Sequence, residues 1–230
     1  MVIYIFFMNI ILITSIINTP NTPLSYIKTR SIYTREERFE QTKRTIKTIR
    51  EKLPDNKIML VECSQLTDLE TDYLKENTNI FLNIYDTGDQ VLINRMFTPS
   101  KAMGEGTMTI YALYYLFSHN IPHNNFFKIS GRYWLTDNFN YDTFNNTNIV
   151  AKYIDNDTEN ALTSLYKLPS TELHNWYKHL LNSENKFREC AGYENIFADF
   201  LKTIEPNKII IPGKIGVAGN IAVSGDKSDT

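Results

Sequence analysis

Charged and small side chains at the ends of apolar segments are the first candidates for chemistry in this sequence. In KISGRY, residues 128–133, a strand-like stretch ends in a small, open turn. Gly131 would let a ligand approach the backbone closely, and Lys128 and Arg132 could neutralise a phosphate group. The alternative is an ordinary Ser-Gly turn with solvated charges, and the motif alone does not separate the two.

Three glutamates are placed where a carboxylate could act. Glu194 begins an amphipathic segment, where the helix dipole favours it, and it could take the proton of an acceptor hydroxyl or simply stabilise the helix end. Glu62 ends an apolar segment, and a carboxylate there suits donors on a base or ribose. Glu105, in a Gly-Glu-Gly turn, is predicted to stabilise the first turn of a helix. Arg35 and Arg38 are predicted to be solvated.

Metal ligands are sparse in this sequence. A literal Asp-x-Asp stands at Asp155-Asn156-Asp157, for which we predict a solvated, Asn-rich loop, with metal binding as the alternative. His119 and His123 have a helical spacing, but Pro122 breaks the helix between them. The two cysteines provide neither a disulfide framework nor a cysteine-built zinc site. They favour a reduced, cytoplasmic location.

Composition limits the classes of protein further. The 230 residues are 42% hydrophobic and 22% charged, which fits one α/β domain with a sizeable core. A net charge of −2 lacks the basic footprint of a nucleic-acid binder. The apolar segment Met1–Ile17 has no positive region and no cleavage site. Residues 9–17 are therefore predicted to form a buried strand rather than a transmembrane anchor, which is the alternative.

Strands and helices alternate along the chain. A capping box at Thr34 and Glu37 opens an amphipathic helix that Pro54 stops, and a second box follows at Thr67. Residues 100–106 are predicted as a loop that feeds a helix ending before Pro122. Further strands are predicted at 57–63, 79–84, 126–130, 148–154, 162–167, 208–211 and 215–217, and further helices at 67–76, 171–181 and 193–204. This order predicts a doubly wound, mostly parallel sheet in a domain of residues 1–222, followed by a flexible polar tail at 223–230.

The order of these segments resembles the nucleotide-sugar-binding part of a GT-A glycosyltransferase of a divergent, family 2-like kind. The strings that carry the resemblance are ILITSII with TREERFEQTKRTIKTIREKLPDNKIMLVECSQ, NRMFTPSKAMGEGTMTIYALYYLF, NNFFKISGRYWLTDNF and AGYENIFADFL. It implies a GT-A-like, Rossmann-like fold and places the donor at the carboxyl ends of the strands. The donor contacts it implies are Thr14, Ser15, Glu62, Ser64, Lys101, Lys128, Ser130, Gly131 and Tyr133, with Arg132 and Glu194 as catalytic residues.

One departure from that family is informative. Where the family has Asp-x-Asp, this chain has Ser130-Gly131-Arg132, so the usual bridge through Mn²⁺ or Mg²⁺ is missing. Arginine and lysine can also offset the charge of a departing nucleoside diphosphate. We therefore expect transfer without a required metal, in which Arg132, with Lys128 or Lys101, stabilises the leaving group. A bound Mn²⁺ or Mg²⁺ remains the alternative.

The resemblance implies a hexosyltransferase that moves a sugar from a UDP- or GDP-linked donor to a hydroxyl of a glycan or another acceptor, as in polysaccharide biosynthesis. A domain that binds a nucleotide or saccharide without turnover is the alternative. Sugar-nucleotide pyrophosphorylases would need a glycine-rich, basic loop directly after the first strand, and residues 18–23 do not provide one.

Overall fold

The computed structural model describes residues 8–155, 157–225 and 227–229. Residues 1–7, which include the start of the apolar segment Met1–Ile17, and Asn156 of the Asp-x-Asp motif lie outside the described residues. Within the described part of the chain, no helix combines the length and the apolar character needed to cross a membrane.

A seven-stranded sheet forms the centre of the molecule, in the order β10-β6-β9-β4-β1-β2-β3. The strands β1, β2, β3 and β4 run parallel to one another, β6 and β10 are also parallel, and β9 is antiparallel to its neighbours β4 and β6. The mostly parallel sheet is therefore confirmed. Its strands are β1 (Ile10–Ser15), β2 (Lys57–Glu62), β3 (Ile80–Asn83), β4 (Asn125–Ser130), β6 (Ile149–Val150), β9 (Leu165–Pro169) and β10 (Ile209–Ile210).

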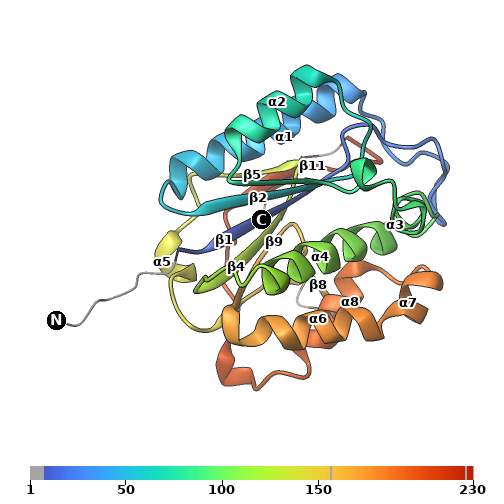
Figure 1. Ribbon diagram of the computed structural model, residues 1–230. Coiled ribbons are helices and arrows are strands. Elements are labelled where there is room, and N and C mark those ends of the chain that lie inside the picture. Colours follow the sequence, from blue (N-terminus) through green and yellow to red (C-terminus); the bar gives the residue numbers. More distant parts are fainter. Residues whose placement is uncertain (1–7, 156, 226, 230) are drawn as a thin grey trace.

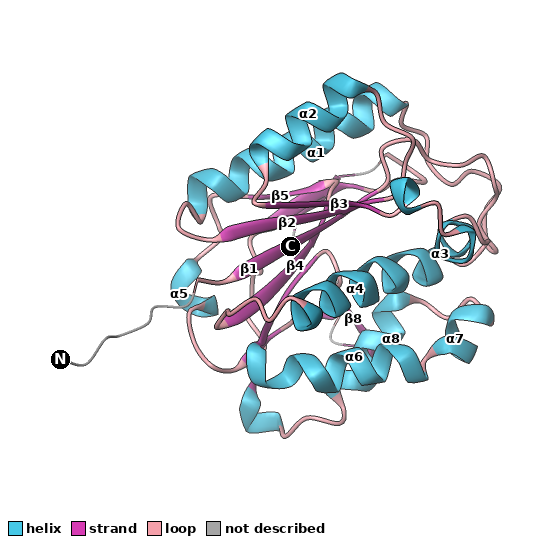
Figure 2. Cartoon of the chain, in the orientation of Figure 1, coloured by secondary structure: helices cyan, strands magenta, loops and turns pink. Residues whose placement is uncertain are grey.

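Helices cover both faces of this sheet (Figures 1 and 2). Successive side chains of β1 point to opposite faces, so Ile11 and Ile13 pack on one side and Ile10 and Leu12 on the other. The first side carries α1 (Arg35–Lys52) and α2 (Asp68–Asn77), and the second carries α4 (Lys101–Ser118), α6 (Leu173–Asn182) and α8 (Tyr193–Leu201). Because both faces are covered, apolar side chains predominate in the central strands.

Shorter elements complete the fold. A three-stranded sheet contains β5 (Tyr133–Leu135), β11 (Val217–Asn220) and β12 (Lys227–Asp229), and a hairpin contains β7 (Tyr153–Ile154) and β8 (Asp157–Ala161). The short helices are α3 (Gln90–Met96), α5 (Tyr141–Phe144) and α7 (Glu184–Arg188), with 3₁₀ turns at Tyr85–Thr87, Ser170–Glu172 and Pro206–Lys208. The strand β12 lies within the segment predicted to be a polar tail.

Both capping boxes are present as predicted. The Thr34 hydroxyl accepts from the Glu37 backbone N–H at 3.3 Å, and the Glu37 carboxylate accepts from the Thr34 N–H at 2.8 Å. Thr67 and Glu70 repeat the arrangement at the start of α2. Each box satisfies two backbone donors that a helix start would otherwise leave unpaired.

The predicted loop at residues 100–106 is wrong. Ser100 caps α4 by accepting from the Met103 N–H at 3.1 Å, and the helix begins at Lys101. Gly104 and Gly106 are helical, and a Cβ at Gly106 would lie 2.4 Å from the Phe187 ring. These glycines allow close helix packing instead of forming a turn.

Other predictions need smaller corrections. The helix predicted at 171–181 is α6, which buries Trp176 fully but leaves Leu181 47% exposed. The strand expected at 148–154 is divided between β6 and β7, and α3 was not predicted.

Candidate functional site

A pocket lies at the carboxyl ends of β1 and β4 and holds about 640 Å³ of empty space, its open mouth included. The chain leaves β1 toward β2 on one side, while β4 lies on the other, so this is the point where strand order reverses. Ligands of open α/β sheets bind at such points. The predicted residues Thr14, Ser15, Ser130 and Gly131 line the pocket.

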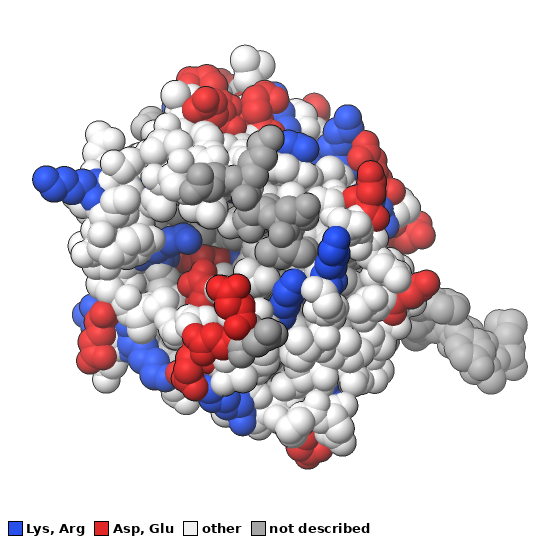
Figure 3. Space-filling view, turned by 180° about the vertical axis from the view of Figure 1, so that it is seen from behind, with Lys and Arg blue, Asp and Glu red and all other residues white. Residues whose placement is uncertain are grey.

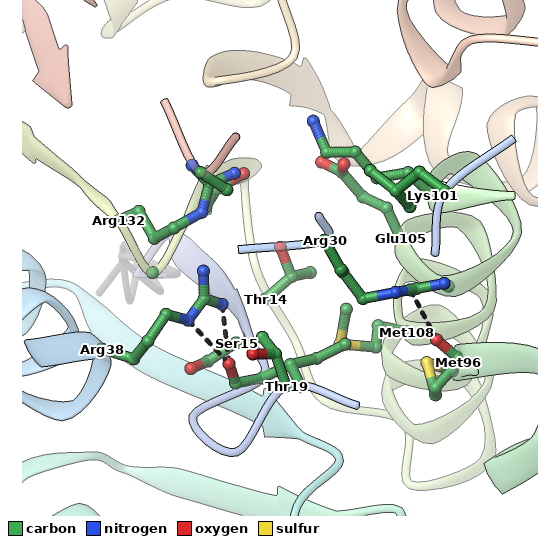
Figure 4. Close-up of a pocket in the computed structure, with 16 residues that line it drawn as sticks. Thr14, Ser15, Thr19, Arg30, Arg38, Met96, Lys101, Glu105, Met108 and Arg132 are labelled. Carbon is green, nitrogen blue, oxygen red and sulfur yellow. Dashed lines mark hydrogen bonds between the residues drawn. The ribbon is translucent and has the colours of Figure 1, made fainter. Parts of the chain in front are cut away.

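Positive charge is concentrated in this pocket. Four cationic side chains line it, each from a different part of the chain: Arg30, Arg38, Lys101 and Arg132. Arg38 and Arg132 approach from one side, and Arg30 and Lys101 from the other, with Thr14 between them (Figure 4). On the face shown in Figure 3, basic and acidic side chains are interspersed. Four cations around one pocket suit a small anion with several oxygens.

Arg132 lies in the pocket wall, as predicted, and is only 8% exposed. Its Nη1 donates to the Asn220 carbonyl at 2.5 Å. The preceding Gly131 packs against β1, where a Cβ would lie 3.1 Å from Cβ of Ser15 and 3.2 Å from Oγ1 of Thr42. The glycine therefore allows the turn after β4 to pass close to β1, which brings the guanidinium to the mouth of the sheet.

Arg38 was predicted to be solvated, and that prediction is wrong. It is 8% exposed and donates to the Ile16 carbonyl from Nε at 2.9 Å and from Nη2 at 2.6 Å. Burial and the neighbouring Arg132 lower its pKa to about 9, although Glu62 opposes the shift. Two guanidinium groups thus lie together, with the buried carboxylate of Glu62 close enough to act on Arg38. Arg38 lies four residues before Thr42 of the buried stripe, which was the sequence signal for its position.

Arg30 was not identified from the sequence. It lies in the irregular segment between β1 and α1, where no periodic pattern marks which side chains point inward. Its guanidinium donates to the carbonyls of Thr22, Met96 and Thr98. Burial lowers its pKa. These bonds attach the segment to the region around α3 and leave Arg30 as part of the pocket wall.

Lys128 was predicted to contact phosphate, but the structure places it behind the pocket. Its side chain is fully buried and forms an ion pair with Glu105. Its Nζ also donates to Ser130 Oγ at 3.0 Å and to the Thr163 carbonyl at 2.8 Å. The charge of Lys128 is therefore already matched within the protein. Glu105 is consequently a pocket residue paired with Lys128, and not the first-turn stabiliser that was predicted.

Glu62 and Ser64 also lie outside the pocket lining. Glu62 is fully buried and accepts from the backbone N–H of Ile17 and of Cys63, both at 3.0 Å, and from Ser64 Oγ at 2.7 Å. Burial raises its pKa. Ser64 Oγ in turn accepts from the Asn18 N–H at 2.9 Å. The pair fixes the chain where it leaves β1, which differs from the predicted contact with a base or ribose.

Glu194 lies in a second pocket beside the first. Its Oε1 accepts from Thr163 Oγ1 at 3.1 Å, and Tyr26 lines the same pocket. Lys101 and Glu105 line both pockets, so they mark the junction between the two. A ligand in the cationic pocket would therefore lie next to a molecule held beside Glu194.

The remaining candidates lie elsewhere. Tyr133 stands in β5, its backbone carbonyl accepting from Thr45 Oγ1 at 2.6 Å, and it does not line the cationic pocket. Asp157 is exposed in β8, where its Oδ1 accepts from the Glu159 N–H at 2.9 Å. Neither Asp155 nor Asp157 lines the cationic pocket. Across residues 8–155, 157–225 and 227–229, no three His, Cys, Asp or Glu side chains gather as metal ligands.

Two segments that lie far apart in the sequence meet at this site. Ala222 lines the pocket, its carbonyl accepts from the Ile32 N–H at 2.9 Å, and the Asn220 N–H donates to the Arg132 carbonyl at 3.3 Å. The segment after β1 and the segment after β11 therefore hold each other in place beside Arg132.

Comparisons with known proteins bear on the fold. No protein-family model matches the chain, and no curated protein matches it by sequence. Among solved structures, it is similar to a CTP:phosphocholine cytidylyltransferase from Streptococcus pneumoniae, with a TM-score of 0.52 and 12% identity over 96% of each chain. A galactosyltransferase solved with donor and acceptor sugar analogues gives a TM-score of 0.48 and 9% identity, over 88% of this chain and 72% of that one.

A glycosyltransferase involved in glycosylation of the major capsid of PBCV-1 gives a TM-score of 0.48 and 10% identity, over 89% of this chain and 81% of that one. The similarity at a TM-score of 0.52, together with the strand order, shows that the fold of this chain is GT-A-like, a mostly parallel sheet flanked by helices, as the resemblance implied.

Proposed function

We propose that this chain is a glycosyltransferase that holds the diphosphate of a nucleotide sugar in the cationic pocket. The observation that carries the proposal is the meeting of Arg30, Arg38, Lys101 and Arg132 at the carboxyl ends of β1 and β4. Guanidinium groups present planar donors that match phosphate oxygens. A diphosphate is the common part of UDP- and GDP-linked sugars, so the pocket suits either donor.

The same cations would act when the glycosidic bond of the donor breaks. Negative charge then builds up on the departing diphosphate, and fixed donors lower the barrier if they meet that charge in a site with little water. Arg132 and Arg38 are buried and already oriented by backbone carbonyls. We therefore propose transfer that requires no divalent metal, with a bound Mn²⁺ or Mg²⁺ as the alternative that the experiment below decides.

Glu194 is the proposed general base. It lies beside the junction of the two pockets and is oriented by the Thr163 hydroxyl. From there it would take the proton of the acceptor hydroxyl as that oxygen attacks the anomeric carbon. The second pocket would hold the acceptor, a glycan or another molecule with a free hydroxyl.

Nucleotidyl transfer is the second candidate function. A nucleotidyltransferase needs basic groups in the segment that follows β1, and residues 18–23 provide none. Arg30, later in that segment, lines the cationic pocket and provides one such group. A domain that binds nucleotides without turnover is the non-catalytic alternative.

One assay separates these functions. The protein is incubated with UDP- and GDP-hexoses and simple glycoside acceptors, and separately with CTP or UTP and a phosphorylated alcohol or sugar. Release of UDP or GDP that depends on the acceptor supports the glycosyltransferase, whereas pyrophosphate release supports nucleotidyl transfer. Binding of UDP without product supports the non-catalytic domain. Activity that is lost in EDTA and restored by Mn²⁺ contradicts metal independence.

A further inference from the structure

Glu105 stands out among the groups that the proposed mechanism does not use. Of the described residues that line the cationic pocket, it is the only acidic one, and it also lines the pocket that holds Glu194. Its side chain is 11% exposed. A carboxylate here weakens phosphate binding through repulsion, and its ion pair with Lys128 occupies only one of its two oxygens.

The carboxylate is held from behind. Its Oε1 accepts from the Nζ of the fully buried Lys128, which Ser130 Oγ and the Thr163 carbonyl fix in turn. Its Oε2 makes no hydrogen bond within the part of the chain that the structure describes. One oxygen is thus anchored while the other is open to a donor from a ligand.

The charge state of Glu105 fits this arrangement. Burial alone would raise its pKa, but Lys128, Lys101 and Arg132 outweigh that effect, and the pKa of the carboxyl is lowered. Glu105 is therefore ionised at neutral pH and can only accept hydrogen bonds. Hydroxyl groups satisfy such an acceptor, whereas a second carboxylate would be repelled.

The position of Glu105 identifies the part of the ligand that it would meet. With the diphosphate on the cations and the acceptor beside Glu194, the sugar of the donor lies at the junction of the two pockets. We propose that Glu105 accepts a hydrogen bond from a hydroxyl of that sugar and thereby selects an uncharged, hydroxylated sugar over an acidic one. This inference rests on the proposed function.

The test compares affinities for a nucleotide with and without its sugar. Dissociation constants for UDP, UDP-glucose and UDP-glucuronic acid, or for the matching GDP series, are measured by calorimetry for the wild type and Glu105→Gln. We expect the variant to bind UDP as tightly or more tightly, because a negative charge has left the pocket. The ratio of the affinity for UDP-glucose to the affinity for UDP should be about tenfold lower in Glu105→Gln than in the wild type. The preference for UDP-glucose over UDP-glucuronic acid should also be smaller in the variant.

Glu194→Gln is the matched control, a nearby carboxylate whose loss should slow turnover without changing the ratio of UDP to UDP-glucose affinity. The inference is overturned if Glu105→Gln weakens the binding of UDP and of UDP-glucose equally, or changes neither affinity. Equal or tighter binding of UDP-glucuronic acid by the wild type also overturns it, and this readout does not depend on the variant folding. Failure of the wild type to bind any nucleotide instead contradicts the proposed function.

Discussion

Arg132 and Arg38 place two guanidinium groups at one wall of the pocket, each donating to a backbone carbonyl. Burial and, after it, the neighbouring Arg132 lower the pKa of Arg38, and an anion bound between the two groups would relieve their mutual repulsion. Their share of the binding free energy can therefore be measured directly.

Arg132→Ala should weaken binding of UDP or GDP by about tenfold to a hundredfold, because a charge-assisted hydrogen bond to phosphate is lost. Arg132→Lys should restore part of the affinity, since the charge returns without the planar fork. Lys47→Ala, at a site on α1 where the side chain is 74% exposed, is the control. Unchanged affinity in Arg132→Ala would remove this arginine from the phosphate site.

Lys167 is a buried cation that, within the described part of the chain, forms no ion pair with a carboxylate. It lies in β9, and its Nζ donates to the Asn146 carbonyl at 2.8 Å, to Asn146 Oδ1 at 3.0 Å and to the Asn148 carbonyl. Burial lowers the pKa of Lys167 from its ordinary 10.5 to about 8. The folded protein therefore releases this proton at a lower pH than the unfolded chain does.

Between pH 8 and pH 10.5 the unfolded chain holds more protons at Lys167, so this residue makes the free energy of unfolding rise with pH. We expect the difference in unfolding free energy between the wild type and Lys167→Met to shift in favour of the wild type by about 1 to 3 kcal/mol across that range. Urea melts at several pH values measure it. Parallel pH profiles for the two proteins would show that Lys167 does not titrate there.

The helix α1 connects stability to the pocket, because Arg38 lies in its first turns and its N–H donates to the Thr34 carbonyl at 3.0 Å. Thr34→Ala should cost about 1 kcal/mol of unfolding free energy and also weaken nucleotide binding, because the helix start that positions Arg38 becomes less ordered.

Thr67→Ala is the comparison for that variant. It removes the equivalent cap of α2, which carries none of the described residues that line the cationic pocket. A similar loss of stability is expected there without a loss of affinity, as denaturant melts and calorimetry would show. Equal losses of affinity in the two variants would mean that the Thr34 cap has no specific role at the site.

The elements that were predicted well from the sequence are those whose boundaries are set by residues close in the sequence. The helix α1 has its own cap and a buried stripe, and β4 is a short, mostly apolar segment that stops before Gly131, so both boundaries follow from nearby residues. The segment 100–106 failed because the role of its glycines depends on Phe187, which lies far away in the sequence. Local propensity carries no information about such a distant contact.

The candidate site was likewise predictable only where the position of a residue follows from the strand that carries it. Thr14, Ser15, Ser130, Gly131 and Arg132 follow from the rule that strand ends carry the ligand, and all five line the pocket. The pairing of Lys128 with Glu105 depends on how α4 packs on β4, which spacing alone does not define. Arg30 depends on an irregular segment held by hydrogen bonds to distant carbonyls.

Taken as a whole, the molecule closes its pocket with two segments far apart in the sequence, one after β1 and one that includes β11 and the residues after it. A bound nucleotide diphosphate should stabilise those segments together, and hydrogen exchange can show it. We expect slower exchange at the N–H groups of Ile32, Asn220 and Gly225, which donate to the carbonyls of Ala222, Arg132 and Ile221. The Ala151 N–H, bonded to Ile210 at the other edge of the sheet, is the control and should not change. Uniform slowing at all four positions would indicate global stabilisation without local closure.

The distribution of the pocket along the chain also has a consequence for folding. The pocket draws on residues from Thr14 to Ala222, and the carbonyl that orients Arg132 belongs to Asn220 in β11. Because β11 pairs with β5, the turn that carries Arg132 acquires this hydrogen bond only when the small sheet forms. The cationic pocket is therefore complete only in a chain that has folded beyond its central sheet.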